Sequence, residues 1–181
     1  MTHIGTQRIE TDRLILRRFE LPDAPAMFDN WASDGEVTKY LTWPTHADVS
    51  ASEQIVGEWA GRYEEKNFYQ WAIVWKNCGP EPIGAVSAVR WDGEVPVIGY
   101  CLGRRWWRQG IMTEALGAVL DFLFCQVGVD RIAAEYDTRN PHSGGVMRKC
   151  GMTFDGVREK AGQNNQGVCD IGCYFMERGE R

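Results

Sequence analysis

The stretch from residue 104 to residue 116 combines the residue types that bind an anion. Its sequence, RRWWRQGIMTEAL, places three arginines and Gly110 directly before an amphipathic helix. A helix start offers unpaired backbone N–H groups and the positive end of the helix dipole, so phosphate and pyrophosphate are its typical ligands. A solvated basic turn is the alternative interpretation, and the rest of the chain must decide between the two.

The composition indicates one globular domain with a sizeable core. Of the 181 residues, 44% are hydrophobic and 25% are charged, which is typical of such proteins. The net charge of −5 argues against a nucleic-acid partner, and no apolar run is long enough for a membrane helix. The first residues lack the pattern of a signal peptide, so a cytoplasmic location is expected.

Six cysteines and three histidines are spread along the chain without metal-ligand spacing. No two cysteines form a C-x-x-C pair, and the histidines lie apart from them. We therefore expect neither a metal site nor a disulfide framework, and interpret most of the cysteines as small buried hydrophobic residues.

Strand-like and helix-like segments follow one another without repeats or linkers. Apolar residues recur at helical spacing from Gly110 to Gly128, Ser50 begins a capping box, and Asp92-Gly93 is a strong hairpin signal. The fold class is therefore α/β (α+β): a single mixed, mostly antiparallel seven-stranded sheet with helices on both faces. One domain is expected over 1–181, with its core at about 8–178. The predicted strands are 8–19, 69–75, 82–91, 95–102, 131–138, 152–158 and 168–176, with a Gly/Asn-rich loop between the last two, and the predicted helices are 22–34, 50–66, 111–127 and 140–150.

Four motifs in this order resemble the GNAT superfamily of acetyl-CoA-dependent N-acetyltransferases. Within it, the chain is similar to the branch of ribosomal-protein N-terminal (alanine/serine) acetyltransferases. Met147 stands where many members carry a tyrosine general acid, so that mechanism is not expected here. The motifs are TDRLILR at 11–17, IGY at 98–100, WRQGIMTEAL at 107–116, and NPHS at 140–143 followed by KCGM at 149–152.

The resemblance implies coenzyme A, in its acetyl form, as the cofactor. Its pyrophosphate fits the backbone N–H groups from Gln109 to Thr113, and arginine side chains add charge. Its pantetheine arm lies along the strand that ends at Leu102, where the sheet splays apart. The expected cofactor-binding residues are Cys101, Leu102, Arg104, Arg108, Gln109, Gly110, Ile111, Met112, Thr113, Asn140 and Ser143.

The catalytic assignments are less specific than the cofactor site. In this branch a serine at the position of Ser143 is the proposed proton donor to the thiol, while a helix-cap hydroxyl is the alternative. Glu135 and Glu94 are candidates for the general base, with Asp137 beside Glu135 on its strand, although a solvated carboxylate is the more common role for any one such residue. The aromatic residues Tyr40, Trp43 and Trp91 are candidates for the acceptor pocket or for the core.

The predicted function is direct transfer of an acetyl group to a primary amine in a ternary complex. Cys101 and Cys150 are accordingly expected not to act as nucleophiles. Acetyl-CoA is the small-molecule donor, and the amine acceptor is a protein N-terminus or a small amine. A homodimer is compatible with the sequence. The alternative function is a GNAT-like module that binds acyl-CoA without turnover.

Overall fold

One mixed sheet of eight strands runs through the part of the chain that the structure describes, residues 1–180 of this computed structural model. The spatial order is β1-β2-β3-β4-β5-β6-β8-β7. Neighbouring strands are antiparallel except β5 and β6, which the predicted crossover makes parallel. The strands are β1 (Ile9–Glu10), β2 (Leu14–Arg17), β3 (Gln70–Trp75), β4 (Pro82–Asp92), β5 (Val95–Leu102), β6 (Arg131–Asp137), β7 (Thr153–Asn164) and β8 (Gly167–Glu177).

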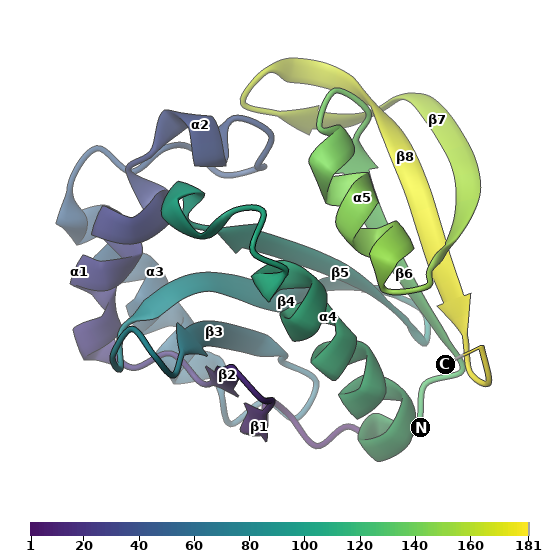
Figure 1. Cartoon of the computed structure of the whole chain (residues 1–181), viewed down its shortest axis with the longest axis horizontal. Helices are drawn as coiled ribbons and strands as arrows, with labels where there is room; N and C mark the ends of the chain where they lie inside the picture. Colours follow the sequence, from purple (N-terminus) through teal and green to yellow (C-terminus); the bar gives the residue numbers. More distant parts are fainter. Residues whose placement is uncertain (181) are drawn as a thin grey trace.

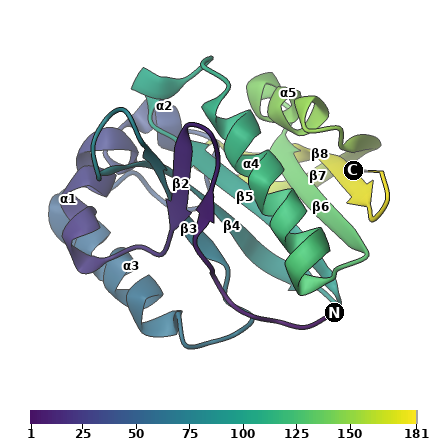
Figure 2. The ribbon, with the colours of Figure 1, turned by 60° about the horizontal axis from the view of Figure 1, so that its bottom comes forward.

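Helices cover both faces of the sheet (Figures 1 and 2). The helices α4 (Ile111–Phe122) and α5 (Pro141–Lys149) lie on one face, while α1 (Ala24–Met27) and α3 (Val49–Arg62) lie on the other. The apolar stripe of α4 forms the larger core with the sheet, and a second core lies under α1 and α3. No helix within the described residues is long and apolar enough to span a membrane.

The predicted first strand, 8–19, is a hairpin of two short strands. The backbone N–H of Thr11 donates to the carbonyl of Leu14 at 3.0 Å, and the N–H of Leu14 donates to the Thr11 hydroxyl at 2.9 Å. These two bonds close a tight turn between β1 and β2. The sheet in the described residues therefore has eight strands rather than the predicted seven.

The predicted helix 22–34 is a series of short turns. After α1 the chain widens into a π-helical turn at Phe28–Ala32, and Asp34 then begins the short helix α2 (Gly35–Thr38) by accepting from the N–H of Glu36. The cap of α3 also differs from the prediction, because Asp48 rather than Ser50 precedes its first residue and accepts a backbone N–H.

The C-terminal hairpin is longer than predicted. β7 continues to Asn164 through two irregularities, one at Gly156 and one between Arg158 and Gly162, so most of the expected Gly/Asn-rich loop is strand. β7 lies at the sheet edge and its residues are largely exposed, which hides the period of an amphipathic strand.

Candidate active site

Gly110 forms the turn from which α4 begins. Its φ of +74° lies in the left-handed region, and a Cβ there would meet Arg13 Nη2 at 3.5 Å. The first bond of the helix runs from the N–H of Glu114 to the carbonyl of Gly110 at 3.0 Å. The N–H groups of Ile111, Met112 and Thr113 therefore lack an intrahelical acceptor and make the helix start a binding place for an anion.

Arg13 and Glu114 fix the loop that leads to this turn. Glu114 accepts from the Thr11 hydroxyl at 2.5 Å and from the backbone N–H of Arg13 at 3.0 Å. The Arg13 guanidinium donates to Glu114 at 2.6 Å and to the carbonyl of Gln109 at 3.0 Å. Burial alone would raise the pKa of Glu114, but these hydrogen bonds lower it below its usual value.

The basic cluster before Gly110 is divided among several partners. Arg104 forms an ion pair with Asp34, 2.9 Å between Nε and Oδ2, and Arg105 lies over the ring of Trp106. Arg108 is exposed, has a φ of +62° and lies two residues before Gly110. Of the two arginines predicted to contact phosphates, the structure thus ties Arg104 to Asp34 and leaves Arg108 at the surface.

A cleft opens where β5 and β6 part. Within the described residues these strands pair at two positions, Val97 with Ala133 and Ile98 with Ala134, and no further. The N–H of Gly103 donates to the carbonyl of Ile83 in β4 at 2.9 Å. Because backbone groups alternate along a strand, those of Tyr100 and Leu102 point away from β4 into the cleft. An extended ligand with amide groups can pair with this open edge.

The backbone groups of Leu102 and Cys101, the last two residues of β5, face in different directions. The carbonyl of Leu102 accepts from the Trp107 indole at 2.7 Å, which anchors the loop to the strand. The backbone groups of Cys101 face β4 by the same alternation, so the open edge belongs to Tyr100 and Leu102 rather than to Cys101. Burial also raises the pKa of the Cys101 thiol to about 12, which makes it a poor nucleophile.

Ser143 and Tyr100 meet across the cleft. Ser143 lies in the first turn of α5, and its hydroxyl donates to the Tyr100 hydroxyl at 3.2 Å. Asn140 precedes the helix, and among residues 1–180 its side chain makes no capping hydrogen bond, so its amide remains available at the cleft. The IGY motif draws attention to Tyr100, but the pairing with Ser143 depends on tertiary structure.

The two candidate bases lie in different places. Glu135 accepts at Oε1 from Arg90 at 2.8 Å and from Arg158, so an ion-pair cluster holds this carboxylate. Glu94 is exposed in the turn between β4 and β5, at the opposite end of β5 from Leu102. Trp91 lies at that end too, where its ring packs against His3 at 4.6 Å. The structure does not bring Glu94 or Trp91 to the cleft.

Tyr40 and Trp43 lie in a segment that contacts the tip of the C-terminal hairpin (Figure 1). Asn165 donates to the carbonyl of Thr38 at 2.9 Å and to that of Trp43 at 2.8 Å. We call residues 38–43 and 164–167 together the hairpin rim, because they adjoin the C-terminal end of β6 at the tip of the C-terminal hairpin.

Asp137, the last residue of β6, holds the hairpin tip to the sheet. Its side chain is 1% exposed and accepts from Arg139 Nη2 at 2.6 Å and from Asn164 Nδ2 at 2.7 Å. Burial would raise the pKa of Asp137, but the hydrogen bonds from Arg139 and Asn164 lower it to about 2. Asp137 is therefore a charged, fully engaged structural carboxylate at neutral pH.

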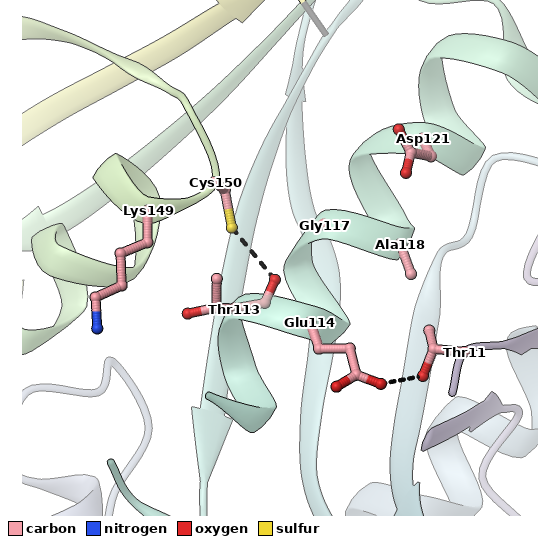
Figure 3. Close-up of a pocket in the computed structure, with 8 residues that line it drawn as sticks. All are labelled: Thr11, Thr113, Glu114, Gly117, Ala118, Asp121, Lys149 and Cys150. Carbon is pink, nitrogen blue, oxygen red and sulfur yellow. Dashed lines mark hydrogen bonds between the residues drawn. The ribbon is translucent and has the colours of Figure 1, made fainter. Parts of the chain in front are cut away.

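A shallow groove of about 350 Å³ runs along α4 from its first turn to the end of α5 (Figure 3). Within it the Cys150 thiol donates to the carbonyl of Thr113 at 3.4 Å, and the Lys149 ammonium lies on the far side. The groove is continuous with the anion-binding turn through Thr113. Its lining consists of Thr11, Thr113, Glu114, Gly117, Ala118, Asp121, Lys149 and Cys150.

A glycine at position 144 of α5 is explained by close packing, because a larger side chain would clash with its neighbour. A Cβ at Gly144 would lie 2.7 Å from Cζ of Tyr136, whose ring is also confined by Gly172. The close neighbour of this glycine is thus an aromatic ring of β6 and not a ligand. A Cβ at Gly145 would meet no atom within 4 Å among the residues described.

Comparisons with known proteins identify the family of this chain. The profile of the acetyltransferase (GNAT) domain matches residues 13–153. The chain is 30% identical over 170 residues to the uncharacterized N-acetyltransferase YoaA of Bacillus subtilis (strain 168), covering 93% of this chain and 95% of that protein. It is 25% identical over 163 residues to the ribosomal protein uS5-alanine N-acetyltransferase of Escherichia coli (strain K12), covering 86% and 82%.

A solved structure shows the same fold. The microcin C7 self-immunity acetyltransferase MccE, in complex with acetyl-CoA and AMP, aligns with a TM-score of 0.79 at 22% identity, covering 92% of this chain and 93% of that one. The profile match spans most of the sequence, and the match to YoaA spans nearly all of it. The chain therefore belongs to the GNAT family of N-acetyltransferases.

Proposed function

We propose that this protein transfers the acetyl group of acetyl-CoA directly to the α-amine of a protein N-terminus. The observation that carries the proposal is the helix start at Gly110 lying beside the open edge of β5. Coenzyme A has a pyrophosphate for the first and an amide-bearing arm for the second. These two features suit that molecule better than a simple nucleotide.

The residues present fit the donor. The N-terminal amides of α4 and the exposed Arg108 would hold the pyrophosphate. The cleft-facing backbone of Tyr100 and Leu102, together with the Asn140 amide, would hold the pantetheine arm. When bound, acetyl-CoA supplies an activated thioester, and the chain's task is to orient it and to move protons.

Transfer without a covalent enzyme intermediate fits the cysteines near the cleft. The raised pKa of Cys101 keeps this thiol protonated, and the Cys150 thiol donates to the carbonyl of Thr113. Neither thiol is poised as a thiolate, which is the nucleophilic form. The acceptor amine would then attack the thioester in a ternary complex, with Ser143 donating a proton on the thiol side.

The ion pairs at the cleft favour an acceptor of low pKa. Glu135 is held by Arg90 and Arg158, and Asp137 is held by Arg139 and Asn164, so both carboxylates are already engaged with protein partners. Roughly a tenth of α-amines are neutral at pH 7, compared with fewer than about one lysine ε-amine in a thousand. An α-amine therefore needs little help in losing its proton. The uS5-alanine N-acetyltransferase relative acts on a ribosomal protein, which supports the same class.

A thiol-release assay with matched peptides tests the proposal. One peptide carries a free N-terminal alanine and no lysine, and its partner has a blocked N-terminus and one internal lysine. Spermidine serves as a small polyamine. We expect the free N-terminal peptide to accelerate release of coenzyme A and to gain one acetyl group by mass spectrometry.

Three other outcomes would contradict the proposal. If coenzyme A is released only with the lysine peptide or only with spermidine, the acceptor is a lysine side chain or a polyamine and not an N-terminal α-amine. Release no faster than the blank across all acceptors, despite binding of acetyl-CoA, would favour the binding module. An acetyl group trapped on Cys101 or Cys150 would overturn direct transfer.

A further inference from the structure

Tyr100 carries a buried hydroxyl that links the two sides of the cleft. It lies on β5 just beyond the last pairing with β6, and its partner Ser143 lies on α5. The two residues share two contacts: 2.8 Å from the Tyr100 hydroxyl to the backbone carbonyl oxygen of Ser143, and 3.2 Å between the two hydroxyls.

The direction of these hydrogen bonds follows from the groups involved. A carbonyl oxygen only accepts, so the single hydroxyl hydrogen of Tyr100 is committed to the Ser143 carbonyl. Tyr100 then has no hydrogen left for the second contact, and Ser143 must be its donor. Tyr100 therefore sets both the position of the Ser143 backbone and the direction of its hydroxyl.

This arrangement is unusual for a serine in the first turn of a helix. Such a hydroxyl ordinarily bonds to nearby backbone groups of its own helix. Here it reaches a different element, 43 residues away in the sequence. Burial raises the pKa of Tyr100, so the phenol keeps its hydrogen at neutral pH and continues to donate.

We propose that Tyr100 is a positioning residue for acetyl transfer, which holds the Ser143 hydroxyl as the proton donor to the leaving sulfur. This inference rests on the proposed function. As the amine nitrogen forms its bond to the acetyl carbon, the carbon–sulfur bond breaks and its electron pair goes to sulfur. Ser143 Oγ turns its hydrogen from Tyr100 to that sulfur and gives it up, and Oγ regains one through water from the amine nitrogen.

Tyr100 assists at the moment when Ser143 has given up its hydrogen. The Tyr100 hydroxyl lies within hydrogen-bonding reach of Oγ, so its hydrogen can turn from the carbonyl to the developing negative charge. The proton count balances, because the amine loses one proton and the thiol gains one. Both side chains end as they began.

Tyr100→Phe tests the role, with Tyr69→Phe as the matched control. Phenylalanine keeps the ring of Tyr100 and removes the two contacts to Ser143. Tyr69 is a buried tyrosine whose hydroxyl accepts from the N–H of Ile4 at 3.2 Å, on another part of the sheet. We expect Tyr100→Phe to lower kcat about ten-fold, which is the loss of one hydrogen bond to a charged group. The KM for acetyl-CoA and the turnover of Tyr69→Phe should change little.

A double variant separates positioning from general loosening. If Tyr100 acts through Ser143, Tyr100→Phe combined with Ser143→Ala should be no slower than Ser143→Ala alone. Two results would assign Tyr100 a structural role instead and overturn the proposal. In one, the kcat losses of the two single variants multiply in the double variant. In the other, calorimetry shows that Tyr100→Phe loses as much affinity for coenzyme A as it loses in kcat.

The thiol pKa of bound coenzyme A gives a readout without turnover. Thiolate absorbance in the ultraviolet follows this titration in the protein complex. We expect the pKa to be lower in the wild type and Tyr69→Phe than in Tyr100→Phe and Ser143→Ala, and equal values in all four would overturn the proposal. If no amine is acetylated, the proposed acceptor fails, while the thiol pKa still decides the role of Tyr100.

Discussion

The Arg13 guanidinium donates to the Glu114 carboxylate at 2.6 Å and joins the β1–β2 turn to the first turn of α4. Arg13 also donates to the carbonyl of Gln109 at 3.0 Å, one residue before the glycine that begins the helix. Two motifs far apart in the sequence thus form one structural unit. That unit fixes the backbone that is proposed to bind the pyrophosphate.

Glu114→Ala should weaken both the fold and coenzyme A binding. It removes the acceptor of three hydrogen bonds, including two from Arg13, and should lower the free energy of unfolding by about 1–3 kcal/mol. The freed Arg13 no longer holds the loop before Gly110. Urea denaturation and calorimetry measure the two effects. Glu10→Ala, in an exposed ion pair with Arg8, is the control and should leave both nearly unchanged.

Gly110→Asp should weaken coenzyme A binding more than Gly110→Asn. Both side chains impose a similar strain at a φ of +74°, so their difference isolates the negative charge. An aspartate at the helix start does not destabilise the helix, but it repels a bound phosphate. We expect at least about ten-fold between the two dissociation constants, on the order of 1.4 kcal/mol. Equal affinities would contradict the placement of the pyrophosphate.

Gly144→Ala and Gly145→Ala should shift stability in opposite directions. At Gly144 the new methyl group would clash with the ring of Tyr136, at a cost of about 1–3 kcal/mol. At Gly145 the methyl group meets open space, and alanine should stabilise the helix by about 0.5–1 kcal/mol. Thermal unfolding of the two variants is a direct comparison, and a stabilised Gly144→Ala would contradict the packing described.

Asp137 should make the protein lose stability in acid. Its pKa is lowered from 3.8 to about 2 in the folded state, so its contribution is present above about pH 4 and is lost as the pH falls to about 2. The contribution is on the order of 2 kcal/mol. Asp137→Asn should therefore have a lower free energy of unfolding than the wild type at pH 7. Urea denaturation at a series of pH values should show this difference in free energy narrowing below pH 4. If the difference in free energy of unfolding does not depend on pH, the charge of the Asp137 carboxylate does not contribute to stability.

The sequence predicted the elements whose burial is periodic. The stripe of α4 and the meander of β3 to β5 bury one side against a core, and their apolar spacing reports this directly. The prediction was wrong where local contacts or edge position dominate. Thr11 closes a tight turn inside the predicted strand 8–19, and the exposed β7 has no apolar period to detect.

Within the site, the sequence indicated backbone features better than side-chain roles. Gly110 and the helix that follows are local signals, and both lie where they were predicted. The partners of Glu135 and Arg104, and the Asn164 amide that bonds to Asp137, come from distant segments, and the sequence holds no local sign of them. The same is true of Tyr100, whose contact with Ser143 appears once β5 and α5 are packed together.

The hairpin rim has a consequence for the order in which the protein folds. Asn165 bonds to the carbonyls of Thr38 and Trp43, which lie 127 and 122 residues earlier in the chain. Early segments emerge from the ribosome long before their partner at the hairpin tip. A growing chain can therefore assemble the helix start at Gly110 while the rim is still missing. Because its contacts join such distant segments, the rim can close only after the chain beyond residue 167 has been made, so it should be among the last parts of the fold to form.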